Sequence, residues 1–190
     1  MNILFVINSL LEKAGSERVA CQLANLFQSE FGYNVTLINR VAQKEQCAFH
    51  VNDEVNYHLL DGGYIPFYFK LQKLISDNEY DIVIVHNMGK MSLLCTLLNL
   101  KNTRLISLEH VAFSSRTNWI KCATKYFYKK VHTIITLTDR DKNEYMTWHP
   151  KVERINNISP YEIQKNYSNS RCKKVIAVGR LTYQKNFQTL

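Results

Sequence analysis

The chain has 190 residues, of which 46% are hydrophobic and 21% charged, a balance that indicates a soluble globular protein and excludes disordered and fibrous classes. Its formal net charge of +8 favours anionic partners such as phosphates or acidic lipid headgroups, without choosing among them. No apolar stretch approaches the roughly 18 residues of a membrane span, and the apolar run near the N-terminus is too short for a secretory signal.

Short apolar runs such as residues 3–7 and 82–85 recur along the chain and predict strands covered on both faces, as in a parallel sheet, whereas residues 55–60 predict a strand with weaker alternation. The predicted strands span residues 3–7, 35–38, 55–60, 82–85, 105–108, 133–137 and 152–155. Apolar residues at helical spacing separate them, with Gly32 expected at one helix C-terminus and Thr138 as the N-cap of another. The predicted helices span residues 16–30, 66–75, 91–100, 118–130 and 139–146. This alternation predicts an α/β fold with a doubly wound parallel sheet, whose ligands bind beyond the carboxyl ends of the strands.

The composition changes after residue 155, where Asn, Ser, Tyr and Lys dominate before a new apolar run at 174–178. We therefore predict a first domain over residues 1–157 and a linker over 158–172. Residues 173–190 would be the start of a second domain that is incomplete, because one strand and part of a helix cannot bury their own apolar faces.

The five cysteines indicate neither a disulfide framework nor a metal site. They lie at positions 21, 47, 95, 122 and 172, and they form no C-x-x-C pair and no zinc-like spacing with histidine. We expect no metal and no other cofactor, and a reducing cytoplasm is the simplest compartment.

The loop of residues 8–15 leads from the first predicted strand into the first predicted helix. Gly15 would let the backbone approach a ligand, and the N–H groups around Ser16 favour an anion or an oxygen-rich group. The alternative is an ordinary turn in which Ser16 is the helix cap. No G-x-G-x-x-G and no Walker lysine is present, so nicotinamide-dinucleotide and P-loop interpretations lose their main support.

Two histidines follow predicted strands at the edge where ligands collect. His110 comes directly after Glu109 and could hydrogen-bond a sugar hydroxyl or act as acid or base, although it could equally cap the loop. His86 lies similarly after its strand, and its position alone leaves a structural or an acceptor-side role open.

The predicted helix at 118–130 is basic and aromatic. It carries Lys121, Lys125 and Lys129 on one face with Lys130 beside them, and this set is called the lysine row below. Such a helix suits an anionic membrane surface, whereas the alternative is an ordinary solvated face. Nucleic acid is not expected, because no recognised binding motif accompanies the charge.

A last cationic pair follows the predicted strand at 174–178. Arg180 and Lys185 flank a turn that Gly179 opens, and two cations at a strand end suit a diphosphate.

Taken together, these segments resemble glycosyltransferase family 4, retaining enzymes with the two-domain GT-B architecture. The resemblance rests on residues 3–10, on Gly15-Ser16-Glu17-Arg18-Val19, and on residues 178–181 with Lys185 and Phe187. Glu109-His110 and Asn157 fit family positions too. Ala14 departs from the pattern, because the family commonly has another glycine there.

The resemblance implies transfer of a sugar from a nucleotide-sugar donor to a glycan or lipid-linked acceptor, with retention. It implies that Arg180 and Lys185 bind the donor diphosphate, that Gly15 and Ser16 approach the reacting centre, and that His110 is catalytic. The enzyme would be cytoplasmic, held by the lysine row on the inner face of the cell membrane. This chain alone is expected to be inactive. A non-catalytic acceptor- or partner-binding domain is the alternative, and a sugar-nucleotide epimerase or a Rossmann oxidoreductase is less favoured.

Overall fold

The computed structural model describes residues 1–41, 47–87 and 89–157, together with Gly179 and Thr189. Contacts divide the chain into two compact units, Met1–Ile158 and Ser159–Leu190. Apart from Gly179 and Thr189, the predicted linker and second-domain segment lie outside the described residues. The fold described below is that of the first unit.

The first unit is built on a seven-stranded sheet in which every described pair of neighbouring strands is parallel. The strands are β1 (Asn2–Ser9), β2 (Asn34–Val41), β3 (Asn56–Leu59), β4 (Ile82–Asn87), β5 (Arg104–Glu109), β6 (Thr133–Thr136) and β7 (Val152–Arg154). Their order is β3-β2-β1-β4-β5-β6-β7, so the direction of strand addition reverses between β1 and β4. The predicted fold class is confirmed, and the central strands are apolar because both of their faces are covered.

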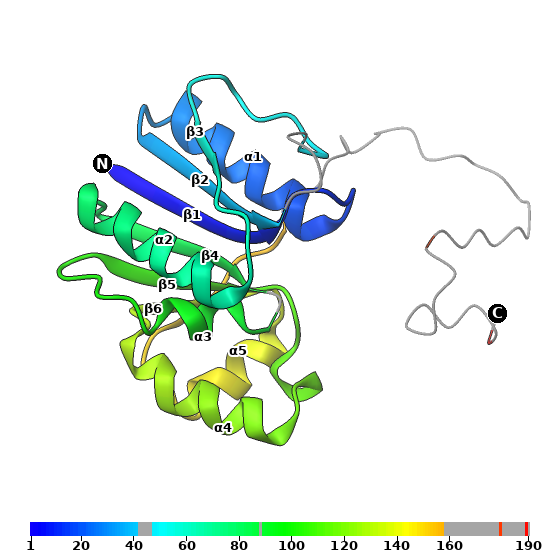
Figure 1. The fold of residues 1–190 in the computed structure, drawn as a ribbon. Helices are drawn as coiled ribbons and strands as arrows, with labels where there is room; N and C mark the ends of the chain where they lie inside the picture. Colours follow the sequence, from blue (N-terminus) through cyan, green and yellow to red (C-terminus); the bar gives the residue numbers. More distant parts are fainter. Residues whose placement is uncertain (42–46, 88, 158–178, 180–188, 190) are drawn as a thin grey trace, which may run out of the picture. The chain divides into compact units, whose positions relative to one another are not determined.

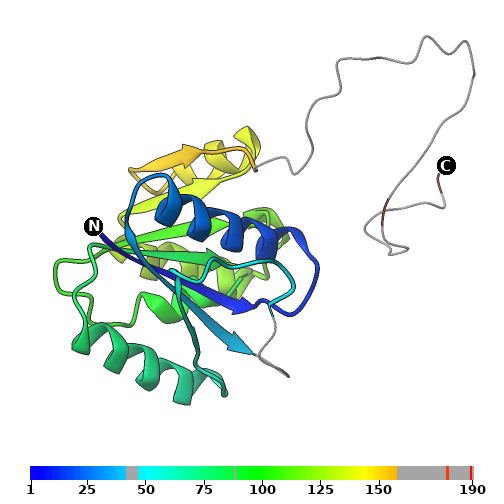
Figure 2. The ribbon, with the colours of Figure 1, turned by 90° about the horizontal axis from the view of Figure 1, so that it is seen from above.

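Helices cover both faces of the sheet (Figures 1 and 2). They are α1 (Gly15–Ser29), α2 (Tyr64–Asp77), α3 (Met91–Cys95), α4 (Asn118–Phe127) and α5 (Asp139–Met146), with short 3-10 turns η1 (Phe113–Ser115) and η2 (Tyr128–Lys130). Helix α1 packs on one face through Ala20, Cys21 and Ala24. Helices α2, α3 and α5 contribute to a second core on the opposite face, where Phe67 and Leu71 of α2 are fully buried.

The predicted helix bounds agree with the structure to within two residues except at the C-terminal ends of α3 and α4. The helix predicted at 118–130 is α-helical only to Phe127 and continues as the 3-10 turn η2. Thr138 accepts a hydrogen bond from the Asp141 backbone N–H at 3.1 Å and caps α5, and Gly32 takes the predicted turn after α1 with φ +62°. Helix α3, predicted to continue to residue 100, ends at Cys95. Thr96 Oγ1 donates to the Leu93 carbonyl at 2.6 Å, and Lys101 adopts φ +48°, a left-handed conformation that no helix interior accommodates.

Candidate functional site

The carboxyl ends of β1 and β4 meet where the strand order reverses, which is the place where doubly wound sheets bind ligands. The loop after β1 enters α1 at Gly15. A side chain at Gly15 would meet no atom within 4 Å, so the backbone is open to a ligand on this side. The N-cap residue is Ala14, which offers no side-chain hydrogen bond to the first turn of α1. These uncapped N–H groups and the helix dipole favour an anion or a hydroxyl oxygen.

Ser16 does not cap α1, so the alternative interpretation of this loop was wrong in that detail. Because the helix starts one residue earlier, Ser16 lies inside the first turn. Its Oγ donates to Glu17 Oε2 at 2.6 Å, and both residues are buried. Gly15 and Ser16 thus lie at the predicted edge of the sheet, and their contact with a substrate remains a prediction.

His110 is paired with His86 across neighbouring strands. His86 lies near the end of β4, and His110 directly follows β5; the two ring nitrogens His86 Nδ1 and His110 Nε2 are 3.1 Å apart. The rings are stacked, with centroids 5.3 Å apart and an interplanar angle of 16°. His86 is fully buried, with the Phe5 ring 5.7 Å from its own. Its Nε2 has no hydrogen-bond partner among the described residues.

Both imidazoles are neutral near pH 7. Burial lowers the pKa of His86 to about 3, and the neighbouring His110 adds to that effect. Burial also lowers the pKa of His110, although the Glu109 carboxylate opposes this. Between two neutral rings one nitrogen donates and the other accepts, so the direction of this bond fixes which nitrogen of His110 carries a proton. Half-buried at the edge, His110 thereby presents a polar but uncharged ring to a ligand.

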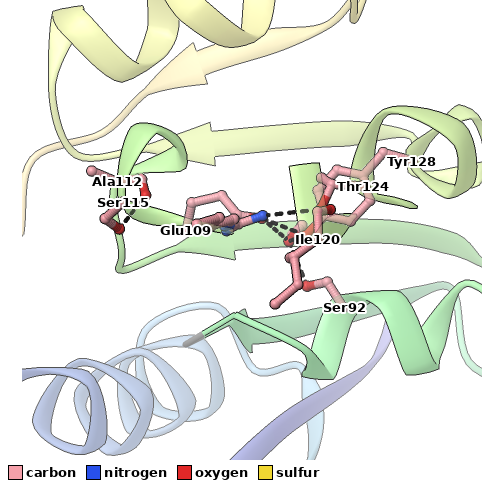
Figure 3. A network of polar contacts seen from close by, with 9 residues as sticks. Ser92, Glu109, Ala112, Ser115, Ile120, Thr124 and Tyr128 are labelled. Carbon is pink, nitrogen blue, oxygen red and sulfur yellow. Dashed lines mark hydrogen bonds and ion pairs between the residues drawn. The ribbon is translucent and has the colours of Figure 1, made fainter. Parts of the chain in front are cut away.

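Glu109, beside His110, lies at the centre of a buried polar network (Figure 3). Its Oε1 accepts hydrogen bonds from the Ser107 hydroxyl at 2.6 Å and from the Tyr128 hydroxyl at 2.7 Å. Its Oε2 forms an ion pair with Arg116, which also donates to Thr124 Oγ1 at 3.4 Å. Burial and the charge of Glu109 raise the pKa of Tyr128, so this hydroxyl stays protonated and donates. All five side chains are buried.

The network ties the loop that carries His110 to two helical elements. Arg116 closes the loop back onto the end of β5, and Tyr128 and Thr124 join η2 and α4 to the same point. Ser92 of α3 extends the network, with its Oγ 2.5 Å from Ser107 Oγ. The sequence predicted His110 and left His86 open, but it did not reveal Arg116 and Tyr128. No local pattern marks either residue, because Arg116 lies among other polar residues and Tyr128 lies in a basic, aromatic run.

The lysine row lies on α4 and η2. Lys121 is half-buried, and the other three lysines are exposed. Lys129 Nζ is 5.6 Å from the centre of the exposed Tyr126 ring, so aromatic and cationic groups are interleaved on this surface as predicted. Whether the surface meets a membrane stays a prediction. In the described part of the chain, no helix combines the length and apolar character needed to cross a bilayer.

Arg180 and Lys185, predicted to bind a diphosphate, lie outside the described residues. Within residues 1–41, 47–87 and 89–157, no group of three or more His, Cys, Asp or Glu side chains could hold a metal ion.

The geometry described above is that of a Rossmann-like domain, with a candidate site where the strand order reverses.

Comparison with known proteins then gives the family. The model of Glycosyltransferase Family 4 matches residues 14–159, and the chain belongs to this family. The chain is 28% identical over 202 residues to the amylovoran biosynthesis glycosyltransferase AmsD of Erwinia amylovora. That alignment covers 99% of this chain and 56% of AmsD, so the chain spans little more than half the length of this relative.

Solved structures show the same fold. The apo form of the lipopolysaccharide outer core galactosyltransferase WaaB has a TM-score of 0.59 at 13% identity, covering 80% of this chain and 44% of WaaB. Anabaena HepE in complex with UDP and glucose has a TM-score of 0.60 at 12% identity, covering 83% of this chain and 44% of HepE. The described unit therefore has the fold of the Rossmann-like domain of GT-B glycosyltransferases.

Proposed function

We propose that the whole protein transfers a sugar from a nucleotide-sugar donor to a hydroxyl of a glycan or lipid-linked acceptor, with retention at the anomeric carbon. The reaction would serve the synthesis of a cell-surface polysaccharide or glycolipid. Family membership supports the class of reaction, and AmsD is a glycosyltransferase of amylovoran biosynthesis. HepE was crystallised with UDP and glucose, which supports a nucleotide-sugar donor.

The observation that carries the proposal is the neutral histidine pair, which lies at the same carboxyl edge of the sheet as the open N-terminus of α1. A sugar is recognised through its hydroxyl groups, and a neutral imidazole both donates and accepts hydrogen bonds without attracting a counter-ion. In this proposal, His110 orients the donor sugar, and the backbone around Gly15 and Ser16 lies against the reacting centre. The N-terminal dipole of α1 stabilises negative charge that develops there.

The leaving diphosphate is assigned to Arg180 and Lys185 by sequence alone. Side chains of this type neutralise the departing charge directly, so the proposed reaction needs no metal and no other cofactor. We further propose that the protein works in the cytoplasm, on the inner face of the cell membrane, with the lysine row against anionic lipids. Each lysine near such a surface contributes about 1 kcal/mol.

The proposal is tested with the complete protein by screening nucleotide sugars against extracted glycans and lipids and analysing the anomeric configuration of the product. His110→Ala is expected to reduce kcat by about 10²–10⁴, the range typical of a positioned histidine. His50→Gln, at an exposed position on the same domain, is the matched control and is expected to leave turnover unchanged. Full turnover in His110→Ala would remove the histidine from the site. An inverted product would refute retention.

Arg180→Ala provides a separate test of the diphosphate assignment. It is expected to weaken donor binding and lower turnover, because the cation that neutralises the leaving group is lost. Unchanged donor affinity and turnover would show that Arg180 does not bind the diphosphate.

A further inference from the structure

An apolar groove lies between helices α3 and α4 on the surface of the first unit. The two helices are labelled in Figure 1. The groove has a volume of about 300 Å³, at the lower end of the range for small-molecule sites. It is lined by Tyr64, Lys90, Leu93, Leu94, Leu97, Trp119, Ala123 and Phe127. Lys90 is the one charged residue among these eight.

The walls of the groove are regular. Trp119, Ala123 and Phe127 follow one another at four-residue spacing along α4, so they form one stripe on that helix. The opposite wall comes from the leucines of α3 and the turn after it. Large apolar side chains remain in solvent here, with Trp119 63% exposed and Leu97 49% exposed. Apolar surface that is both exposed and concave indicates a binding site more strongly than scattered exposed residues do.

The groove begins at the same edge of the sheet as the candidate site. Lys90 follows the end of β4, and Trp119 lies in the first turn of α4, beyond the end of β5. Tyr64 starts α2, and the Arg40 guanidinium lies 4.4 Å from the centre of its ring. Arg40 also donates to Asn8 Oδ1 at 2.8 Å, which links this wall of the groove to the end of β1. A ligand lying in the groove would therefore have one end near the site.

The charge of this region selects an anionic head group. The eight residues that line the groove include Lys90 and no acidic residue, and Lys121 and Lys125 lie on α4, the helix that forms one wall. At the mouth of the groove, Lys90 Nζ lies 5.8 Å from the centre of the Trp119 ring. A ligand with a hydrocarbon chain and a phosphate complements both parts, because the chain matches the apolar walls and the phosphate matches the lysine.

We infer that this groove binds the hydrocarbon chain of a phosphate-linked acceptor lipid, with the phosphate at Lys90 and the glycan end at the sheet edge beside His110. The inference rests on the proposed function and narrows it, because it selects a lipid-linked acceptor over a free glycan. It also differs from adsorption of α4 to a membrane. A chain held in the groove needs empty volume, whereas adsorption needs only exposed apolar and cationic groups.

Decyl phosphate, kept below its aggregation concentration, is the probe, and Trp119 fluorescence is the readout. The second tryptophan, Trp148, is half-buried against the core on α5's side of the domain, with its ring centroid 5.4 Å from that of Phe113, and it supplies a constant background. We expect a saturable blue shift with decyl phosphate and none with inorganic phosphate at the same concentration. Decanol, which lacks the charge, is expected to bind several-fold more weakly.

Ala123→Phe separates the groove from surface adsorption, because it fills the volume while adding apolar surface. We expect Ala123→Phe to weaken decyl phosphate binding at least tenfold. The affinity of Ala123→Leu should lie between those of the wild type and Ala123→Phe, and this smaller variant serves as the test if Ala123→Phe does not fold. Lys90→Gln is expected to remove the preference for decyl phosphate over decanol. Met146→Phe, at an exposed position on α5, is the matched control and should change nothing.

Equal or tighter binding by both Ala123 variants would overturn the inference in favour of adsorption, as would wild-type protein that binds decyl phosphate no better than inorganic phosphate. The measurement needs no donor and no turnover. Failure of the proposed transferase activity would therefore leave the binding result intact. Conversely, if decyl phosphate does not bind in the groove, the inference fails, and transfer to a water-soluble acceptor is tested separately by the activity assay.

Discussion

Burial of an uncharged His86 makes the stability of the domain depend on pH in a predictable direction. The pKa of His86 is about 3 in the folded protein, against an ordinary value of 6.5. Between these values the unfolded chain binds the proton more readily, so acidification favours unfolding and stability falls as the pH falls. With these two pKa values, proton linkage at His86 lowers the free energy of unfolding by about 2 kcal/mol between pH 7 and pH 5. For a domain of this size, that corresponds to a Tm decrease of about 4–8 °C.

The measurement is urea unfolding followed by circular dichroism at pH 7 and pH 5, for wild-type protein and His86→Gln. The variant removes the titrating ring while keeping a polar side chain, so it should lose about 2 kcal/mol less than the wild type over this pH interval. His50→Gln, at an exposed position, should behave like the wild type. If His86→Gln loses as much stability as the wild type on acidification, His86 is not held neutral in the folded protein and the description of the pair fails.

Three further outcomes follow from local structure. Replacing all four residues of the lysine row by Gln should weaken binding to anionic vesicles at low salt by about 1 kcal/mol per lysine, as sedimentation would show, while neutral vesicles bind both proteins equally. Burial raises the pKa of Cys95 to about 12, so native protein should be alkylated at the exposed Cys122 and spared at Cys95, as peptide mass spectrometry would show; equal labelling would contradict the packing. Thr138→Ala should cost about 1 kcal/mol of unfolding free energy because α5 loses its cap, and Thr138→Ser should cost much less.

The strands and most helix starts could be predicted because their signals are local. A run such as Ile3 to Ile7 is apolar at every position only when both faces of the strand are covered, and the structure buries all five side chains. The cap at Thr138 is likewise set by residues three positions apart. The end of α3 was missed because Leu97, Leu98 and Leu100 continue the apolar pattern of a helix after the backbone has left it.

The candidate site could be predicted only in outline, because its contacts join distant parts of the chain. The order of elements was enough to place His110 at the carboxyl edge of the sheet. The contact between His86 and His110 depends on β4 and β5 being neighbours in the sheet. The spacing of residues along the sequence does not reveal which strands are neighbours. Arg116 and Tyr128 are seven and nineteen residues from Glu109 and meet it only after α4 has packed. The groove depends in the same way on the position of α3 against α4.

The buried pair of Glu109 and Arg116 is better explained by positioning than by stability. Removing two charges from water costs several kcal/mol per ion, and replacing such a pair by neutral groups is often harmless to folding. Glu109→Gln alone leaves the Arg116 charge buried without a counter-ion and should cost about 3–5 kcal/mol. The double variant Glu109→Gln/Arg116→Met removes both charges while keeping an acceptor for Tyr128, so its stability should return close to that of the wild type.

What the double variant should not recover is the placement of His110, because Arg116 no longer holds the loop to the end of β5. Two-dimensional NMR of the histidine ring nitrogens reports this directly, since the bond with His86 fixes one tautomer of each ring. We expect the wild type to show a single tautomer of His110 and the double variant to show averaged signals with near-normal stability. A stable double variant that retains one His110 tautomer would refute the positioning role, because the loop would then be held by its packing alone.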